Sequence, residues 1–366
     1  MRVIALVTLP SLGAGNRVRI EQYAPLLRER GIDLRVSAFF DDATYRILYQ
    51  PGRTARKVLG VARGLLRRVR DLRLASEADL VIVYRESAPL GPPLFERYLG
   101  RIGVPYLYDF DDALHLAPIH PANRRWSWLR HPSRAAETAR RAAAVTTDNE
   151  YLAAWARRHN PNVTVINSPV DTDRHRPMVR SGDGPPVIGW VGSSTTAPYL
   201  GILDAPLRRL HARRPFVFRV IGGDYSHATA TVDVRPYRLD EEPREVAAFE
   251  IGVQPAPDDE WSRAKGTFKA LLYMAAEVPV VASRVGVIPE IVPHAEVGYC
   301  VASDDEWVEA LDSLLADPVL RSRFGRAGRA WVEARYSLRV AAPRFAAALE
   351  AAAGGPRPRR VPSSVP

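Results

Sequence analysis

The sequence predicts an α/β protein built from two doubly wound domains, each with a parallel sheet. Short apolar segments alternate with amphipathic stretches along most of the 366 residues. Parallel strands need helical crossovers, so this alternation favours sheets that are covered by helices. A chain of this length, 46% hydrophobic and 25% charged, exceeds one typical domain and can bury two cores.

Residues 1–175 are expected to form the N-terminal domain. It opens with a strand–helix–strand pattern in which Gly31 ends the helix. The expected elements are a strand at 2–9, a glycine-containing loop at 11–16, a helix at 17–30, strands at 33–40, 80–84, 105–108 and 144–147, a helix at 150–159 and a strand at 163–166. Ligands of such sheets gather at the carboxyl ends of the strands, so we look for a site in the loops that follow them.

A polar segment rich in proline and glycine, 176–186, is expected to link this domain to a second one at 187–335. The expected elements of the second domain are strands at 187–191, 216–221 and 251–254 and helices at 306–315 and 320–334. Residues 336–353 hold an alanine-rich C-terminal helix that can pack back on the N-terminal domain. The tail 354–366, rich in proline and arginine, is expected to be disordered.

The segment 264–286 carries the strongest indication of a ligand. After Gly266 its apolar residues recur with helical spacing, and a short apolar run at 280–282 has the character of a buried strand. Gly266 lets an anion approach the helix N-terminus, where Lys265 and Lys269 add two positive charges one turn apart. The pattern predicts a phosphate site. The alternative is an amphipathic helix whose lysines form an ordinary solvated face.

Five stretches of the chain, in their order, resemble the family-4 retaining glycosyltransferases. They are PSLGAGNRVRIEQY at 10–23, LYDFDDAL at 107–114, SPVDTDRHRP at 168–177, VIGWVGSSTTAPYL at 187–200 and IGVQPAPDDEWSRAKGTFKALLYMAAEVPVVASRVGVIPEIV at 251–292. The resemblance covers nearly the whole chain and implies the GT-B architecture, in which two Rossmann-like domains face a cleft. It also implies a hexosyltransferase-like enzyme that moves a sugar from a nucleoside-diphosphate sugar to an acceptor hydroxyl with retention of configuration.

The resemblance implies roles for particular residues. Lys265 and Lys269 would contact the donor diphosphate and stabilise the negative charge that develops on it. Asp111 falls near the position where many relatives place a histidine that contacts the donor sugar, and it completes the expected catalytic set. The expected donor-binding residues are Gly13, Gly15, Asn16, Gly192, Ser193, Gly222, Gly266, Thr267 and Leu272, with Arg17 and Arg19 as further phosphate contacts.

The chain departs from the family pattern after the strand at 187–191, where Ser193, Ser194, Thr195 and Thr196 replace the Arg and Lys that are often found there, and at two further positions. Members carry two glutamates eight positions apart, one near the transferred sugar and one on the nucleotide ribose, where this chain has Ala264 and Leu272. Two alternatives therefore stay open: a nucleotide-sugar epimerase of the same fold, and a non-catalytic partner protein with a degenerate donor site. For an active enzyme, the expected acceptor is a sugar of a glycan, a lipid-linked sugar or a small natural product.

No metal or other cofactor is expected. Asp109 and Asp111 have the D-x-D spacing that presents two carboxylates to a divalent cation in another glycosyltransferase fold, but here they follow an apolar strand. Asp112 can serve as a capping or turn residue. Three nearby histidines lack metal-ligand spacing and are expected to be structural or surface residues: His115, His120 and His131.

The basic character of the chain, with a net charge of +10, is concentrated in a predicted amphipathic helix at 53–74. Its apolar stripe consists of Val58, Ala62, Leu65, Val69 and Leu72. This stripe can rest on an anionic membrane, or it can dock on the N-terminal domain as in an ordinary surface helix. Nucleic acid is not an expected partner, because no aromatic residue interleaves the arginines.

The sequence indicates a cytoplasmic protein that can associate with the inner face of the membrane. A single cysteine, Cys300, excludes an intramolecular disulfide. The N-terminal apolar run is too short for a signal peptide and flows into a glycine turn. No stretch approaches the ~18 apolar residues of a membrane-spanning helix.

Overall fold

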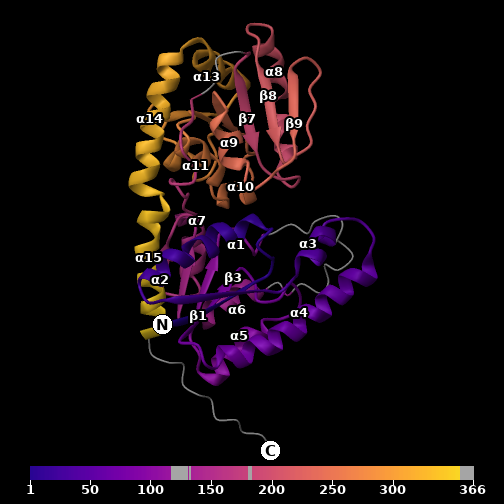
Figure 1. Ribbon diagram of the computed structural model, residues 1–366, viewed down its shortest axis with the longest axis vertical. Helices are drawn as coiled ribbons and strands as arrows, with labels where there is room; N and C mark the ends of the chain where they lie inside the picture. Colours follow the sequence, from indigo (N-terminus) through magenta and orange to yellow (C-terminus); the bar gives the residue numbers. More distant parts are fainter. Residues whose placement is uncertain (117–130, 132, 180–183, 355–366) are drawn as a thin grey trace, which may run out of the picture. The chain divides into compact units, whose positions relative to one another are not determined.

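Figure 1 shows the computed structural model of the protein, which describes residues 1–116, 131, 133–179 and 184–354. Contacts between residues divide the chain into two compact units. Unit 1 holds Met1–Ser168 and the chain from Ala341 onward, and unit 2 holds Pro169–Val340. Each unit contains one six-stranded sheet whose neighbouring strands are all parallel. The predicted α/β class with two parallel sheets is confirmed.

The sheet of unit 1 has the strand order β2-β1-β3-β4-β5-β6. Its strands are β1 (Arg2–Val7), β2 (Asp33–Ala38), β3 (Leu80–Tyr84), β4 (Tyr106–Phe110), β5 (Ala144–Thr147) and β6 (Val163–Val165). Every residue of β3 and β4 is buried, as parallel strands covered on both faces require. Since β3 pairs with both β1 and β4, the loops that follow these three strands meet at one end of the sheet.

The helices of unit 1 differ from expectation near the N-terminus. They are α1 (Ala14–Arg19), the 3-10 helix η1 (Glu21–Tyr23), α2 (Ala24–Glu29), α3 (Asp42–Leu48), α4 (Thr54–Ala75), α5 (Leu94–Ile102), α6 (Arg134–Arg141) and α7 (Glu150–Arg157). The single helix expected at 17–30 is wrong, because Ile20 leaves helical geometry and Pro25 can stand only in the first turn of a new helix. Gly31, with a φ of +74°, ends α2 as predicted.

The C-terminal helix α15 (Leu338–Gly354) belongs to unit 1 from Ala341 onward. Its Phe345 stacks on Tyr23 with the ring centroids 4.5 Å apart. This contact lies within unit 1, on the segment where the sequence predicted a helix packing back on the N-terminal domain.

The sheet of unit 2 has the order β12-β11-β10-β7-β8-β9. Its strands are β7 (Val187–Val191), β8 (Val217–Ile221), β9 (Thr231–Arg235), β10 (Ile251–Gln254), β11 (Val280–Ser283) and β12 (Gly298–Val301). Its helices are η3 (Ala197–Leu203), α8 (Asp204–His211), α9 (Glu242–Ala247), α10 (Glu260–Ala264), α11 (Phe268–Ala275), α12 (Ile288–Ile291), α13 (Asp304–Ala316) and α14 (Pro318–Arg335). Trp190 and Val191 of β7 belong to different hydrophobic clusters, since successive side chains of a strand point to opposite faces.

The segment that begins at Ala264 contains a break between two helices. α10 ends at Ala264 and α11 begins at Phe268, so the expectation of one glycine-opened helix carrying both lysines is wrong. Lys265 has extended backbone at the end of α10, with φ −80° and ψ 137°, whereas Lys269 lies in the first turn of α11. The two lysines therefore come from different local structures.

The long helix α4 confirms the helix expected at 53–74 but turns another face inward. Its buried residues are Gly60, Gly64, Arg68, Asp71 and Ala75. Three members of the predicted apolar stripe, Val58, Leu65 and Val69, are 52%, 45% and 54% exposed. Of the two alternatives for this stripe, docking on unit 1 is wrong for these three residues, because the glycine face provides the closer approach: a Cβ atom on Gly64 would lie 2.4 Å from the ring of Phe39.

Some expectations fall outside the described residues. These are His120, positions 180–183 of the predicted linker and positions 355–366 of the predicted tail. Before the linker, the backbone of Val170 is hydrogen-bonded to Tyr336 and Leu338 within unit 2. In the described ranges, no helix combines the length and the apolar character needed to cross a membrane.

Candidate functional site

Two loops at the carboxyl ends of strands in unit 2 and the first turn of α11 meet at Gly192, Gly222 and Lys269. Gly192 follows β7 and Gly222 follows β8, while Lys269 lies in the first turn of α11, which comes after β10 and α10. A Cβ atom on Gly222, whose φ is +80°, would lie 2.4 Å from the carbonyl oxygen of Gly192. One on Gly192 would lie 3.0 Å from Cε of Lys269. The close approach requires both glycines, and it brings together three residues that the sequence predicted as ligand contacts.

The ammonium group of Lys269 is held in place by neutral groups. Its Nζ donates a hydrogen bond to Oγ1 of Thr196 at 3.2 Å and lies 5.0 Å from the ring centroid of the buried Trp190. Burial, together with the positive charge of Lys265, lowers the pKa of Lys269 to about 7. Thr196 and Trp190 thus orient the charge without neutralising it.

Lys265 supplies the second charge of this site. Its Nζ lies 5.7 Å from the ring centroid of Trp261. Within the part of the chain that the structure describes, no carboxylate forms an ion pair with Lys265 or Lys269. The chain contains only three lysines, Lys57, Lys265 and Lys269, and all its other formal cations at neutral pH are arginines. Two neighbouring ammonium groups that repel each other form a site that an anion would stabilise.

The N-terminus of α11 adds further donors to this region. Thr267 is its N-cap residue but makes no capping hydrogen bond, and its buried hydroxyl has no partner among the described residues. The first turn contains no acidic side chain. Free N–H groups and the helix dipole at such a start favour negative charge, and Gly266, just before the N-cap residue, has no side chain that would obstruct an anion. The arrangement suits a phosphate group.

The remaining predicted residues of unit 2 fall into two groups. Ser193 is exposed in the loop after β7, where its Oγ lies 2.7 Å from Oγ1 of Thr195. Leu272 is 2% exposed within a hydrophobic core cluster, and Ala264 is fully buried. The loop therefore offers hydroxyls to a ligand, whereas Ala264 and Leu272 serve packing here.

In unit 1, Asp111 is joined to Tyr84 and Arg85 near the ends of β3 and β4. Its Oδ1 accepts hydrogen bonds from the Tyr84 hydroxyl at 2.9 Å and from Nε of Arg85 at 2.7 Å, and its Oδ2 accepts one from Nη2 of Arg85 at 2.9 Å. A Cβ atom on Gly15 would lie 2.5 Å from the Tyr84 hydroxyl oxygen. The structure thus brings the predicted residues Gly15 and Asp111 together.

Tyr84 and Arg85 were missed by the sequence analysis. The one signal that could have indicated them is their place at the carboxyl end of an apolar strand. Arg85 has a left-handed backbone with a φ of +59°, and its Nη2 also pairs with Asp112 at 2.6 Å. Such a conformation persists in a non-glycine residue where surrounding contacts over-determine it, and it occurs often at functional sites.

The charge of Arg85 keeps Asp111 ionised. Burial alone would raise the pKa of this carboxyl group, but the guanidinium of Arg85 and its hydrogen bonds lower the pKa to about 2. At neutral pH, Asp111 is therefore a fixed hydrogen-bond acceptor and does not act as a proton shuttle.

Asp109 is occupied by a buried ion pair. Arg19 donates to its two carboxylate oxygens at 3.1 and 2.5 Å, and Thr146 donates at 2.6 Å. The expected role of Arg19 as a phosphate contact is wrong, because its side chain is 1% exposed and consumed by this pair. Burial would lower the pKa of Arg19, but the negative charge of Asp109 raises it above its usual value. In the described ranges, no three His, Cys, Asp or Glu side chains are grouped to hold a metal ion.

The glycine loop after β1 is braced by its own side chains. Asn16 is buried and donates Nδ2 to Oε1 of Glu21 at 2.7 Å, so its amide shapes the loop. Arg17 donates to the carbonyl oxygen of Ser11 at 2.5 Å. Gly13 is the N-cap of α1, and a Cβ atom there would lie 3.1 Å from Cβ of Leu9. These contacts hold Gly15 against Tyr84.

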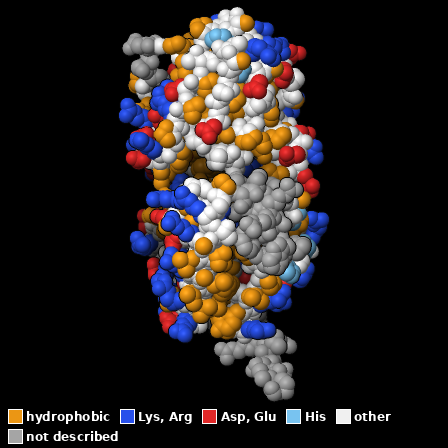
Figure 2. All heavy atoms as spheres, turned by 90° about the vertical axis from the view of Figure 1, so that its right-hand side faces the viewer, with side chains coloured by type: hydrophobic (Ala, Val, Ile, Leu, Met, Phe, Trp, Pro, Cys, Tyr) orange, Lys and Arg blue, Asp and Glu red, His pale blue; other side chains and the backbone are white. Residues whose placement is uncertain are grey.

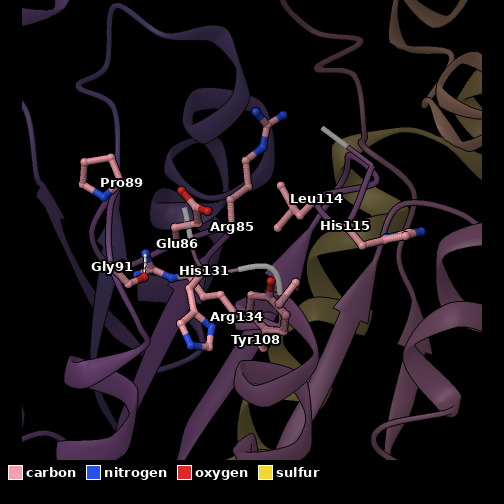
Figure 3. Close-up of a pocket in the computed structure, with 10 residues that line it drawn as sticks. Arg85, Glu86, Pro89, Gly91, Tyr108, Leu114, His115, His131 and Arg134 are labelled. Carbon is pink, nitrogen blue, oxygen red and sulfur yellow. Dashed lines mark hydrogen bonds between the residues drawn. The ribbon is translucent and has the colours of Figure 1, made fainter. Parts of the chain in front are cut away.

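A cavity of about 100 Å³ lies beside Arg85 in unit 1 (Figure 3). Its lining comes from the segment after β3, from β4 and the segment after it, and from the start of α6: Arg85, Glu86, Pro89, Gly91, Tyr108, Leu114, His115, His131, Arg134 and Ala135. Arg134 donates Nη1 to the carbonyl oxygen of Gly91 at 3.1 Å, while its Nε makes no hydrogen bond within the described chain. The buried hydroxyl of Tyr108 also lacks a partner there. The cavity therefore offers unused polar groups to a ligand.

Comparison with known proteins identifies a glycosyltransferase family model that matches unit 2. Residues 185–317 match the family model described as Glycosyl transferases group 1. The matched range contains Gly192, Gly222 and both lysines of the unit 2 site. No curated protein sequence matches the chain.

Solved glycosyltransferase structures match almost the whole chain. The HepE protein of Anabaena in complex with UDP-glucose matches with a TM-score of 0.66 at 16% identity, over 96% of this chain and 99% of that one. Sucrose-phosphate synthase from Thermosynechococcus elongatus matches with 0.65 at 15% identity, over 94% and 97%. WaaG, a glycosyltransferase involved in lipopolysaccharide biosynthesis, matches with 0.62 at 14% identity, over 95% and 99%. The chain has the GT-B fold of these proteins.

Proposed function

We propose that the protein is a cytoplasmic, retaining glycosyltransferase of glycan biosynthesis. It transfers a hexose-like sugar from a nucleoside-diphosphate sugar to an acceptor hydroxyl of a glycan, a lipid-linked sugar or a natural product. The family match at 185–317 and the GT-B fold support a transferase. The observation that carries the proposal is Lys269, an ammonium group without a carboxylate partner among the described residues, set against Gly192 at the ends of parallel strands.

In the proposed complex, unit 2 binds the donor. Lys265 and Lys269 contact the diphosphate, and the N–H groups of Gly266 and Thr267 add hydrogen bonds. Ser193 and its neighbouring hydroxyls line the loop after β7 and face the same ligand. UDP-glucose is the first donor to test, because a protein of the same fold, HepE of Anabaena, binds it.

The proposed chemistry places the main catalytic contribution at the leaving group. The bond between the anomeric carbon and a diphosphate oxygen breaks, and the acceptor oxygen bonds to that carbon on the same face. The acceptor proton passes to the departing diphosphate. Negative charge therefore grows where the two lysines lie, and preorganised donors at that point lower the barrier without a metal or a protein base.

We assign the acceptor side to unit 1. Asp111, held ionised by Arg85, accepts a hydrogen bond from a sugar hydroxyl, as fits its role in the proposed catalytic set. The cavity beside Arg85 provides room for a polar part of the acceptor, together with donors that have no partner among the described residues. Gly13, Gly15 and Asn16 border this side by shaping the loop next to Tyr84.

A non-catalytic glycosyltransferase-like partner protein is the second candidate. One observation favours it: Ala264 and Leu272 are buried at the positions where the family has two glutamates. Such a protein could still bind the donor through its lysines, but it would neither transfer nor hydrolyse the sugar.

A screen of nucleotide sugars separates these candidates. We expect at least one of them to raise the melting temperature of the wild-type protein, because a ligand that binds only the folded state stabilises it. Lys269→Met should lose this response, whereas Lys57→Met, which changes a lysine of unit 1, should keep it. Release of nucleoside diphosphate in the presence of an acceptor extract supports the transferase. Stabilisation without release supports the non-catalytic protein, and stabilisation by no nucleotide sugar refutes the donor site.

A further inference from the structure

The inner face of α4 is fastened to unit 1 by glycines and by one buried arginine. A Cβ atom on Gly60 would lie 2.4 Å from the Thr44 side chain, and one on Gly64 would lie 2.4 Å from the Phe39 ring. Arg68 donates to the carbonyl oxygens of Val7 and Ser87 at 2.6 and 2.5 Å. Its charge is balanced by Asp71, the only acidic residue of the helix, at 2.8 Å. Val61 also packs against the cluster of Phe39, Phe40 and Ala88, whereas most of the other large apolar side chains of α4 stay exposed.

The outer face of α4 is apolar along several turns. Its large side chains are Val58, Leu59, Leu65, Leu66 and Val69, which are 52%, 49%, 45%, 73% and 54% exposed. Val58 and Val69 are eleven positions apart, so at a rise of about 1.5 Å per residue the patch is about 16 Å long. Figure 2 shows hydrophobic side chains gathered on this side of unit 1, with Lys and Arg side chains beside them. An exposed apolar patch of this kind is typical of a surface that binds a membrane or another protein.

A row of arginines runs beside this patch. Arg56, Arg63 and Arg70 are exposed and stand seven residues apart, so they lie on one line along the helix. None of them forms an ion pair with a carboxylate of the described residues, and the one acid of the helix, Asp71, is buried with Arg68. The outer face of α4 is therefore an apolar stripe bordered by exposed arginines.

We propose that the outer face of α4 docks on a membrane surface that contains anionic lipid. A helix with one apolar face and a basic border lies in the plane of the interface, with its apolar side chains among the acyl chains and its arginines at the phosphates. A second copy of this chain is a poorer occupant, because two such faces would bring arginine against arginine with no exposed acid of α4 between them. This docking would bring the protein to lipid-linked substrates, but it does not depend on the proposed function.

Co-sedimentation with lipid vesicles tests the proposal. We use vesicles of phosphatidylcholine alone and vesicles with about a third of phosphatidylglycerol, at low and high salt. The wild-type protein should sediment with the anionic vesicles only, and salt should weaken the binding. Arg63→Glu with Arg70→Glu should lower binding by about 30-fold or more, since each basic residue near an anionic surface contributes roughly fivefold. Leu66→Ser should lower it by about fivefold through loss of apolar burial.

Matched variants on unit 2 control for net charge and surface apolarity. Arg208 of α8 and Arg326 of α14 are exposed, and their change to glutamate alters the total charge by the same amount. Val319, 76% exposed, is the counterpart of Leu66. Circular dichroism and melting temperature check that each variant folds. Unchanged binding in the unit 2 variants supports docking through α4.

Three results would overturn the proposal. Binding to neither kind of vesicle, or equally to both, removes anionic lipid as the partner. An equal loss in the unit 2 variants assigns the binding to net charge alone. Self-association that Leu66→Ser abolishes, without any vesicle binding, makes a second copy of the chain the occupant of this face.

Discussion

Lys269 should take up a proton when a nucleotide sugar binds. Its pKa is about 7 in the unliganded protein, because burial and Lys265 disfavour its charge. At about pH 8, one unit above this value, roughly a tenth of unliganded molecules carry that charge. A diphosphate beside the ammonium group favours the protonated form and raises the pKa again. Binding at pH 8 should therefore take up about 0.9 of a proton per ligand, and binding at pH 6 about 0.1.

Two measurements read this proton directly. Titration calorimetry at pH 8 in buffers with different ionisation enthalpies gives the number of protons taken up, with the nucleotide sugar that stabilises the protein most. Reductive methylation with a carbon-13 label gives one NMR signal for each of the three lysines, and Lys269→Met assigns the signal of interest. Lys57→Met serves as the control in both measurements, because its lysine lies in α4.

The same shift predicts how stability depends on pH. The unfolded chain holds a proton on Lys269 up to a pH near its ordinary pKa of 10.5, whereas the folded protein releases it near pH 7. Between these values the unfolded state binds more protons, so the free energy of unfolding rises with pH, by up to about 1.4 kcal/mol per unit from this group. Lys269→Met should lack this contribution. Equal proton uptake in wild type and Lys269→Met, or a Lys269 signal that titrates near pH 10, would refute the reasoning.

Three further predictions concern the metal, Asp111 and α4. Activity should survive EDTA, because lysines neutralise the proposed leaving group. If EDTA abolished the activity and Mg²⁺ or Mn²⁺ restored it, Asp109 and Asp111 would have to be considered as metal ligands. Asp111→Asn should lower the free energy of unfolding by about 1–3 kcal/mol at neutral pH. This loss of stability relative to wild type should disappear as the pH falls from the ordinary carboxyl pKa of 3.8 to about 2, where the wild-type carboxyl becomes protonated. Denaturant melts of both proteins at several pH values measure the loss, and a loss that does not change with pH would contradict the assigned pKa. Gly64→Ala should lower the melting temperature, because the new Cβ atom would lie 2.4 Å from the buried Phe39 ring. Gly100→Ala in α5 should raise it, because a Cβ atom there meets no atom within 4 Å and alanine favours the helix. A higher melting temperature in both variants would show that the Phe39 ring can move aside at little cost.

Most of the strands were readable from the sequence. The apolar runs at β3, β5, β7 and β10 were predicted with the bounds that the structure shows, because a buried parallel strand needs a continuous apolar run between breakers. β9 and β12 were not predicted. Thr231–Arg235 alternates polar and apolar residues at a sheet edge, and Gly298–Val301 opens with glycine, so neither strand has such a run.

The roles of charged residues could not be read from their spacing. Arg19 stands in a glycine loop and suggested a phosphate contact, but its partner Asp109 is 90 positions away in the sequence. Asp109 and Asp111 are two positions apart, yet one is neutralised by Arg19 and the other by Arg85. A charge becomes available to a ligand only where the fold gives it no partner, and pairing across the sheet decides that.

The sequence by itself determined the fold class and the presence of a basic amphipathic helix, because both depend on the periodicity of apolar residues. It also determined the glycine turns after β7 and β8, because these depend on the backbone freedom of glycine. Only the tertiary structure decided which face of α4 is buried and how strongly Lys269 holds its proton. Both depend on what lies opposite. Thr44 and Phe39 fit the glycines and leave the leucines outside, and Trp190 with Lys265 surrounds the ammonium group with apolar surface and like charge.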